Sequence, residues 1–483
     1  MIEYLLLAPV FTSLLCFTLK KQKQIEIINL TGSTVTLLLG SSLMVRVFRE
    51  GTVVTWEDML FADAFSAYLV LIVSLVGFTA SMYSIGYMGY EIRHGSMDLK
   101  RLRLYYGLFH LFMFSMLLVG VTNILGLWIA IEMTTLISAP LMILYSKKSS
   151  VEAAWKYLII CTVGITFALF GTILTYYAAV QVLGEHQEAI NWAHLITVAE
   201  RFDPMLMKIA FIFILIGYGT KVGLAPMHTW LPDAHSEAPS PVSALLSGVL
   251  LNCAMYAIIR FRTITAPSTG ADFTNNLLII FGLLSLGIAV PFILLQKDYK
   301  RLLAYSSVEH MGIIAVGIGF GGVLGTYGAL LHMFNHAVTK SLMFFGAGNV
   351  LLKYGTKRID KVSGVVKSMP LTGTMLILGG LAITGSPPFG IFISEFTVLA
   401  AGFSQGKIVS TVLVLLFIIM IFAGFFNHIS RMALGTPHPD VKGEVSRWNL
   451  GAMVFLMVFV LVLGVYIPQP FYEMIMNVVE IVR

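Results

Sequence analysis

The stretch "GYGTKVGLAPMHTWLP", residues 217–232, interrupts a long apolar segment with three glycines, two prolines and Lys221. Glycine and proline inside a membrane helix leave backbone amides and carbonyls without helical partners, which is tolerated only inside protein or beside water. A second stretch, "TGSPPFGIFISEF" at residues 384–396, repeats this pattern with Pro387, Pro388 and Glu395. Two matched broken segments, each with one charge, indicate an ion site in a membrane transporter fold.

The composition supports a membrane location for these segments. Hydrophobic residues make up 57% of the 483 residues, charged residues only 12%, and the mean hydropathy is +0.86. A soluble domain has about 25% charged residues, and a spanning helix needs about 20 mostly apolar ones. We therefore predict an all-α polytopic membrane protein, embedded in the lipid bilayer, with about fourteen transmembrane helices. The approximate spans are residues 2–19, 25–48, 62–88, 104–122, 124–146, 153–180, 205–230, 241–262, 275–295, 302–321, 324–351, 371–401, 408–434 and 449–470.

The two broken segments divide the predicted helices into repeated units. Helices four to eight occupy residues 104–262, and helices nine to thirteen lie within 263–434, starting near residue 275. Lys221 lies 117 residues into the first set of spans and Glu395 lies 120 residues into the second. Because five is odd, successive five-helix repeats must be inverted in the membrane. Residues 1–103 then form helices one to three, and residues 435–483 carry helix fourteen.

The distribution of lysine and arginine predicts the topology. With the N-terminus outside, 21 of the 31 lysines and arginines fall on the inner side and 8 on the outer side, Arg260 and Arg262 among them. Such a bias is typical of cytoplasmic loops. We expect a multi-pass protein of the cytoplasmic membrane with both termini outside. The net charge of +6 is explained by this inner face, so we expect no nucleic-acid partner.

Two ionisable residues of the first repeat lie within apolar segments. Glu132 lies near the middle of its span, and Lys221 lies at the first break. The two side chains could form an ion pair that separates when a proton arrives, or a static structural pair. Burial and a nearby carboxylate act in opposite directions on the proton affinity of a lysine. A movement of the partner would therefore change that affinity strongly.

The second repeat carries a stripe of ionisable groups in "LHMFNHAVTKSLMFF", residues 331–345. His332, His336 and Lys340 are four residues apart and share one helix face. A charge at the centre of a bilayer costs about 2.5–3.5 kcal/mol on insertion scales. Because histidine takes up and releases protons near neutral pH, the stripe indicates a proton relay, with Glu395 as its terminal acid. The alternative is a set of satisfied core residues.

Three further residues could extend this relay. Glu309 and His310 in "YSSVEHMG" could continue the line, or could lie near a glycine-rich helix start. Asn252 cannot titrate; it could bridge water molecules or hydrogen-bond a neighbour. A polar loop, "WLPDAHSEAPSPV", could be a cation entry funnel or a simple surface loop; its ionisable residues are Asp233, His235 and Glu237.

The sequence holds no recognisable cofactor motif. Three cysteines, without any CxxC pair, cannot ligate an iron–sulfur cluster by themselves, and all three lie in apolar segments. Phosphate-binding GxxxxGK, dinucleotide-binding GxGxxG and zinc-binding HExxH patterns are absent from the sequence. We therefore expect no cofactor, no metal and no catalytic residue in this chain.

Three runs carry a resemblance to a known family. The run "KVGLAPMHTWLPDAHSEAPSPVSALLSGVLLN" (221–252) resembles the antiporter-like subunits shared by respiratory complex I, Mrp sodium/proton antiporters and energy-converting membrane-bound hydrogenases. The runs "QKDYKRLLAYSSVEHMG" (296–312) and "LLHMFNHAVTKSLMFFGAGNV" (330–350) are similar to later helices of that family. The resemblance covers roughly residues 60–440. The "YSSVEHMG" run looks most like the branch of hydrogenase-4 component F, formate hydrogenlyase and archaeal membrane-bound hydrogenases or sulfur reductases.

The resemblance also implies residue roles. It implies fourteen helices, inverted five-helix repeats, and broken helices seven and twelve. It assigns proton or ion translocation to a helix-five glutamate, a helix-seven lysine, a helix-eleven relay and a helix-twelve terminal acid: Glu132, Lys221, His332, His336, Lys340 and Glu395. Asn252 departs from the pattern, because many members carry lysine or histidine there. Water, or Glu309 and His310, would have to close that gap.

By resemblance, the chain is a non-redox subunit that translocates protons, alone or coupled to Na⁺, within a redox-driven oxidoreductase complex. Iron–sulfur clusters, a nickel–iron centre and the ferredoxin or NADH reaction would belong to peripheral redox subunits beside other membrane subunits. One alternative is a Mrp-type Na⁺/H⁺ antiporter subunit without a redox partner. Others are a subunit similar to M or N of NADH-quinone oxidoreductase, or a structural role for the buried charges.

Overall fold

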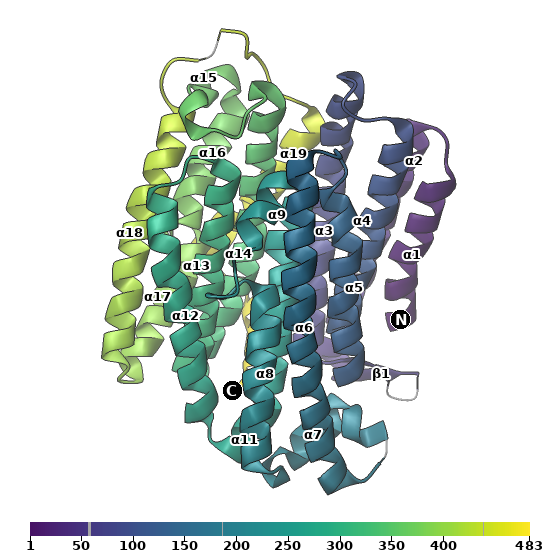
Figure 1. Cartoon of the computed structure of the whole chain (residues 1–483), viewed down its shortest axis with the longest axis vertical. Coiled ribbons are helices and arrows are strands. Elements are labelled where there is room, and N and C mark those ends of the chain that lie inside the picture. Colours follow the sequence, from purple (N-terminus) through teal and green to yellow (C-terminus); the bar gives the residue numbers. More distant parts are fainter. Residues whose placement is uncertain (57–58, 186, 438) are drawn as a thin grey trace.

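The computed structural model describes residues 1–56, 59–185, 187–437 and 439–483. It is a bundle of helices with one small hairpin (Figure 1). In chain order the elements are α1 (Ile2–Thr18), α2 (Gln22–Glu50), β1 (Val53–Thr55), β2 (Leu60–Ala62), α3 (Ala64–Arg93), α4 (Leu99–Gly120), α5 (Ile124–Met142), α6 (Lys148–Leu183), α7 (Trp192–Val198), α8 (Pro204–Val222), α9 (Leu231–Glu237), α10 (Ser240–Leu245), α11 (Leu251–Thr269), α12 (Ala271–Leu294), α13 (Tyr299–Phe320), α14 (Gly322–Tyr354), α15 (Val365–Ser368), α16 (Pro370–Ile383), α17 (Gly390–Ser404), α18 (Ile408–Ala433), α19 (Arg447–Val465) and α20 (Gln469–Val482).

Most of these helices can cross a bilayer. Within the described residues, eleven helical segments are long and apolar enough to span a membrane, and three shorter apolar helices, α1, α16 and α17, accompany them. The prediction of an all-α polytopic membrane protein is therefore confirmed. The chain ends lie in the half of the bundle away from α15 (Figure 1).

Helix α14 forms the centre of the second half of the chain. Every residue from Gly328 to Val350 is buried, so the stripe that contains the histidines faces protein on all sides. By contrast, α6 and α18 expose much of their apolar surface. The ionisable groups of α14 therefore avoid the cost of facing lipid, because neighbouring helices enclose them.

The first predicted break lies between α8 and α9. Gly223 ends α8 in the left-handed conformation with φ of +80°, and a Cβ there would lie 2.5 Å from Leu231 Cδ1. Side chains satisfy some of the freed backbone groups: Trp230 Nε1 donates to the Thr220 carbonyl at 2.8 Å, and the Ala225 amide donates to Ser285 Oγ at 2.9 Å. Irregular backbone at this depth requires such partners.

The second predicted break lies between α16 and α17. Gly385 has φ of +68°, and a Cβ at this position would lie 2.0 Å from Glu395 Oε2. Asn335 of α14 donates from Nδ2 to the Gly390 carbonyl at 2.7 Å, where α17 begins. The structure thus brings the unwound backbone against the terminal acid and the central helix, and both sequence breaks are confirmed.

Three charges at or near the ends of predicted spans are buried inside helices. Arg260 and Arg262 were counted on the outer side and Lys300 on the inner side, but all three are at most 4% exposed. Each has internal partners; Arg260 pairs with Asp63, and Lys300 donates to the Ala238 carbonyl at 2.5 Å. A span predicted from hydropathy ends where charged residues begin. The helices themselves extend past these charges, because hydrogen bonds and an ion pair within the protein stabilise the buried side chains.

Candidate functional site

Lys221 is held by two hydroxyl groups. It lies in the last turn of α8, is 1% exposed, and its Nζ donates to Thr135 Oγ1 at 2.6 Å and Tyr157 Oη at 2.7 Å. The ammonium also lies 4.6 Å from the centroid of the Tyr157 ring, a distance suited to a cation–π interaction. Tyr157 is itself fixed by a 2.8 Å hydrogen bond with Ser138. We call Thr135 and Tyr157 the Lys221 dock.

Glu132 does not contact Lys221. It lies one turn before Thr135 on α5, and its closest described partner is Thr162, whose Oγ1 donates at 3.5 Å. Its Oε2 is buried with no hydrogen-bond partner among the described residues. The expected ion pair is not formed, because the dock supplies the partners of the ammonium. The two charges still act on each other electrostatically.

Lys340 repeats this arrangement in the second half. Its Nζ donates to the Leu303 carbonyl at 2.7 Å and to Ser306 Oγ, both on α13. Glu309 lies one turn after Ser306 and is 2% exposed. It acts on Lys340 electrostatically, yet no ion pair joins them in the described part of the chain. Each lysine is thus held by a hydroxyl that lies three residues from a glutamate.

The buried histidines of α13 and α14 form a hydrogen-bonded chain. His310 Nδ1 lies 3.0 Å from His332 Nε2, and His332 Nδ1 lies 2.9 Å from Ser394 Oγ. The His336 ring lies 5.3 Å from the His310 ring, and neither of its nitrogens has a partner among the residues described. His310 therefore lies inside α13 at the centre of the cluster, not at a helix start.

Glu395 closes this cluster from α17. It is 5% exposed, and its Oε1 has no hydrogen-bond partner in the described ranges. One donor atom from each of Glu395, His310 and His332 lies within 4.8 Å of the others. Such a spacing allows a proton to pass between them directly or through one water molecule. Two imidazoles and a carboxylate are also a donor set that transition metals accept.

Asn252 joins the two halves of the chain without titrating. Its Nδ2 donates to the Gly248 carbonyl at 2.8 Å and to the Met333 carbonyl of α14 at 3.1 Å. Its Oδ1 is buried and has no partner in the part of the chain described. Of the two alternatives, the structure shows the hydrogen bond to a neighbour, and Oδ1 leaves an acceptor for water.

A cavity of about 360 Å³ lies at the surface beside this half of the molecule. Its lining includes Lys147, Glu237, Asp298, Lys300 and Lys357. His235, next in the chain to the lining residue Ser236, is fully buried and stacks on Phe344 with ring centroids 5.2 Å apart. The charges of Lys300 and Lys340 both act on His235.

The segment predicted as a polar loop begins with the short helix α9, which carries Asp233, His235 and Glu237 and has two sides. On the surface side, Asp233 forms an ion pair with Arg301 at 2.5 Å, and Glu237 forms one with Lys357 at 2.7 Å. On the inner side, the ring of His235 is buried and neither of its nitrogens has a partner among the described residues.

The sequence reasoning missed Thr135, Tyr157 and Ser306. One signal was available for the α13 face, because positions 300, 303, 306 and 310 follow helical spacing and place Lys300, Ser306 and His310 in one line. For the Lys221 dock we find no comparable signal.

The broken helices and the enclosed lysines define a class of multi-pass membrane protein, the antiporter-like subunits of complex I-related complexes. Residues 121–421 match the family described as "NADH:quinone oxidoreductase/Mrp antiporter, TM", and the chain belongs to this family. It is 41% identical over 412 residues to the hydrogenase-4 component F homolog of Methylacidiphilum infernorum, covering 85% of this chain and 86% of the relative.

Two solved structures share the fold. A chain of the membrane-bound sulfane sulfur reductase, an archaeal respiratory membrane complex, superposes with a TM-score of 0.88 at 24% identity, covering 100% of this chain and 97% of that one. A chain of the Mrp complex from Dietzia sp. DQ12-45-1b gives a TM-score of 0.87 at 18% identity, with coverage of 100% and 96%. Both relatives are parts of multi-subunit membrane complexes.

Proposed function

We propose that this chain translocates protons across the cell membrane as the ion-conducting subunit of a redox-driven complex. The observation that carries the proposal is the placement of Lys221 and Lys340, each enclosed and each held by a hydroxyl near an unpaired glutamate. A lysine in this position can change partners at low cost. A fixed ion pair would resist such an exchange.

The proposed topology has fourteen crossings with both termini outside. Eleven crossings are the spanning segments described above. The other three would be α1, α14, and the pair of α16 and α17, which together form one broken crossing. Helices four to eight (104–262) and nine to thirteen (263–434) would be inverted repeats. Glu132 and Glu309 would then occupy matching helices, α5 and α13, and each lies three residues from the hydroxyl that holds a lysine.

Protons would enter the second half from the cytoplasm through the cavity beside Lys300. From there His235 would carry them towards Lys340, since its ring is fully buried and neither ring nitrogen has a partner among the described residues. Lys340 would pass a proton to His336 and then to the pair of His310 and His332. Glu395 would release it to the outer side.

The first half would drive this transfer. A charge change in a neighbouring subunit would draw Lys221 from its dock towards Glu132, which is only partly enclosed at the edge of the protein. Loss of the Lys221 charge from its dock would alter the potential at Asn252, where a bridging water is expected to connect the halves. Both half-channels must not open together, and the two breaks are suitable gates.

The redox chemistry would lie outside this chain. The relative with 41% identity is named for a hydrogenase, and one structural relative is a chain of a sulfur reductase. We propose that iron–sulfur clusters, with or without a nickel–iron centre, and the ferredoxin- or NADH-linked reaction belong to peripheral partner subunits.

The first experiment is purification from native membranes in mild detergent, with identification of the partners and assays for nickel and iron. Nickel and iron together with soluble redox chains would support an energy-converting hydrogenase. Iron without nickel would point to a sulfur-reducing or complex I-like relative. Small membrane partners without either metal would overturn the redox proposal in favour of a Mrp-type Na⁺/H⁺ antiporter, which the fold also fits.

A transport assay tests the relay separately. Lys221→Ala and Glu395→Ala should each abolish proton movement in a complex that still assembles. Lys208→Ala is the matched control, because Lys208 lies on the same helix as Lys221 but contacts the ring of Phe273. Unchanged pumping in a fully assembled Lys221→Ala complex would end the relay proposal. Repeating the assay with and without Na⁺ identifies the ion.

A further inference from the structure

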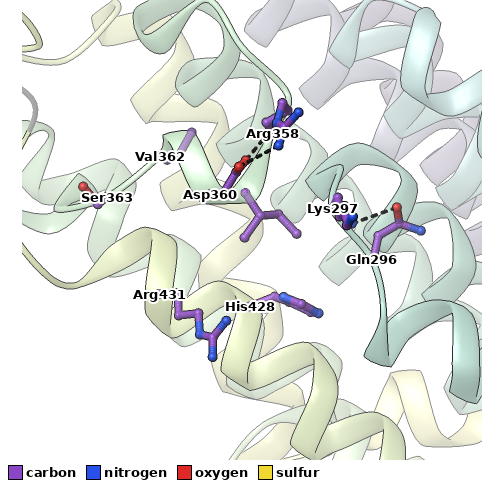
Figure 2. Close-up of a pocket in the computed structure, with 9 residues that line it drawn as sticks. Gln296, Lys297, Arg358, Asp360, Val362, Ser363, His428 and Arg431 are labelled. Atoms are coloured by element: carbon purple, nitrogen blue, oxygen red, sulfur yellow. Dashed lines mark hydrogen bonds and ion pairs between the residues drawn. The ribbon is translucent and has the colours of Figure 1, made fainter.

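A second cavity, of about 460 Å³, lies where α12 and α18 end (Figure 2). Figure 2 shows Gln296 and Lys297 on one side of it, His428 and Arg431 of α18 below, and the turn with Arg358 and Asp360 above. None of these residues takes part in the proposed relay.

The cavity has more positive than negative charge. Lys297 and Arg431 are exposed, and neither lies within 4 Å of a carboxylate in the described part of the chain. Arg358 is bound to Asp360 by hydrogen bonds of 2.9 and 2.7 Å, so these two charges offset each other. Two cations therefore remain for an anionic ligand.

A buried histidine supplies an unpartnered polar atom. His428 is 7% exposed, and its Nε2 lies 3.1 Å from the Ile293 carbonyl and 3.2 Å from the Leu294 carbonyl. Carbonyl oxygens only accept hydrogen bonds, so Nε2 donates, and in the tautomer with its proton on Nε2 the Nδ1 atom is an acceptor. This Nδ1 is buried and has no partner among the described residues. It could accept from a ligand hydroxyl.

Exposed apolar residues adjoin the lining residues in the chain: Leu294 and Leu295 come directly before Gln296, and Leu434 follows Arg431 by three residues. Leu294, Leu295 and Leu434 are 43%, 79% and 55% exposed, at the ends of the same two helices. Helix α18 buries little of its apolar surface within the protein, as expected for a helix that faces lipid. A ligand with an acyl chain would cover these leucines, whereas free phosphate would not.

We propose that this cavity binds the headgroup of an anionic glycerophospholipid of the phosphatidylglycerol type. The phosphate pairs with Lys297 and Arg431, a headgroup hydroxyl donates to His428 Nδ1, and the acyl chains lie along the exposed leucines. Basic pockets between membrane helices recognise lipid headgroups in this way. The proposal does not depend on proton translocation.

The test is native mass spectrometry of the intact complex in detergent, titrated with phosphatidylglycerol, phosphatidylcholine or inorganic phosphate. We expect phosphatidylglycerol to bind selectively. Lys297→Gln and Arg431→Gln should each weaken it about fivefold, and the double variant about 25-fold. Lys407→Gln, at the opposite end of α18, is the matched control and should change nothing.

Two more variants separate the possible ligands. His428→Phe should reduce the preference for phosphatidylglycerol over phosphatidic acid, which lacks the headgroup hydroxyls. Leu295→Ser should weaken lipid binding but not phosphate binding. Equal binding of inorganic phosphate, unaffected by Leu295→Ser, would overturn the lipid assignment. Retention of a protein partner that crosslinks to Lys297 and excludes lipid would overturn it as well.

Discussion

The molecule handles its buried charges in two opposite ways. Arg260 and Asp63 form a complete ion pair, with Nη1 and Nη2 donating to the carboxylate at 2.7 and 2.5 Å and Nε donating to Tyr256 Oη at 2.9 Å. Lys221 and Lys340 have glutamates nearby but bind hydroxyls instead. A charge with all its partners in place fixes two helices together. A charge held near, but not on, its counter-ion remains able to move.

Breaking the complete pair should have the largest effect. Arg260→Met leaves the buried Asp63 carboxylate without a counter-charge, which costs about 3–5 kcal/mol. We expect the yield of assembled complex and its thermal unfolding temperature to fall sharply. The double variant Arg260→Met with Asp63→Leu is the control and should recover much of that stability, because no charge is left unpaired. A double variant as unstable as the single one would contradict this role.

Replacing the docked lysines should give the reverse result. Lys221→Met and Lys340→Met remove a buried cation that has no carboxylate partner among the described residues. The desolvation cost that disappears with the charge offsets the lost hydrogen bonds, so we expect stability to change by less than about 1 kcal/mol. Proton translocation should fall at least about 100-fold, because methionine cannot take over the proton that the lysine is proposed to carry. Translocation by reconstituted complex and thermal unfolding are measured together. A loss of stability as large as that of Arg260→Met would show that the lysines are structural.

The sequence predicted the fold well because its strongest signals are local. Apolar windows, and glycine and proline within them, report directly on spanning helices and their breaks, and both breaks lie where they were expected. The spacing of His332, His336 and Lys340 likewise predicted one face of one helix. All three are buried in α14. Their role as a relay stays a prediction.

The partners of the lysines could not be predicted in the same way. Serine and threonine are common in membrane helices and usually bond to their own backbone, as Ser138 does with the Thr134 carbonyl. Nothing in the sequence separates Thr135 from such residues. The Arg260–Asp63 pair joins positions 197 residues apart, and no local pattern reports a contact of that separation.

Removing the hydroxyl groups that hold the two lysines should have an intermediate effect on translocation. Thr135→Val and Tyr157→Phe each keep the shape of the side chain but remove one hydroxyl from Lys221, and Ser306→Ala does so for Lys340. A hydrogen bond to a charged group contributes about 1.5–3 kcal/mol, so the balance between dock and glutamate should shift at least about tenfold. We expect slower translocation and a displaced pH profile.

Conservative rescue distinguishes a dock from a packing contact. Thr135→Ser retains the hydroxyl and should translocate protons at close to the original rate, although it loses a methyl group. If Thr135→Ser were as slow as Thr135→Val, packing rather than the hydroxyl would explain the effect. Lys221 and Lys340 should respond to a similar degree, because each keeps one acceptor after the change: the other hydroxyl for Lys221 and the Leu303 carbonyl for Lys340.

The smallest effect is expected at the surface, where an ion pair is formed but hydrated. Lys357 Nζ lies 2.7 Å from Glu237 Oε1. Burial raises the pKa of Glu237, but the hydrogen bond and the charge of Lys357 outweigh it and hold the pKa below its ordinary value. A lowered pKa gives stability that is present above the ordinary value and is lost as the pH falls through the folded-state pKa.

The contribution of the Glu237 charge to stability is the difference in the free energy of unfolding between the original protein and Glu237→Gln. Thermal unfolding at pH 7 and below pH 4.5 measures this difference. The difference should be less than about 1 kcal/mol at pH 7 and should shrink in acid, because a partly exposed pair is screened by solvent. Glu50→Gln, which removes a more exposed pair with Arg46, is the control and should give a smaller difference. A pH-independent difference at Glu237 would mean that its hydrogen-bonding shape, and not its charge, holds α9 to the loop before α15.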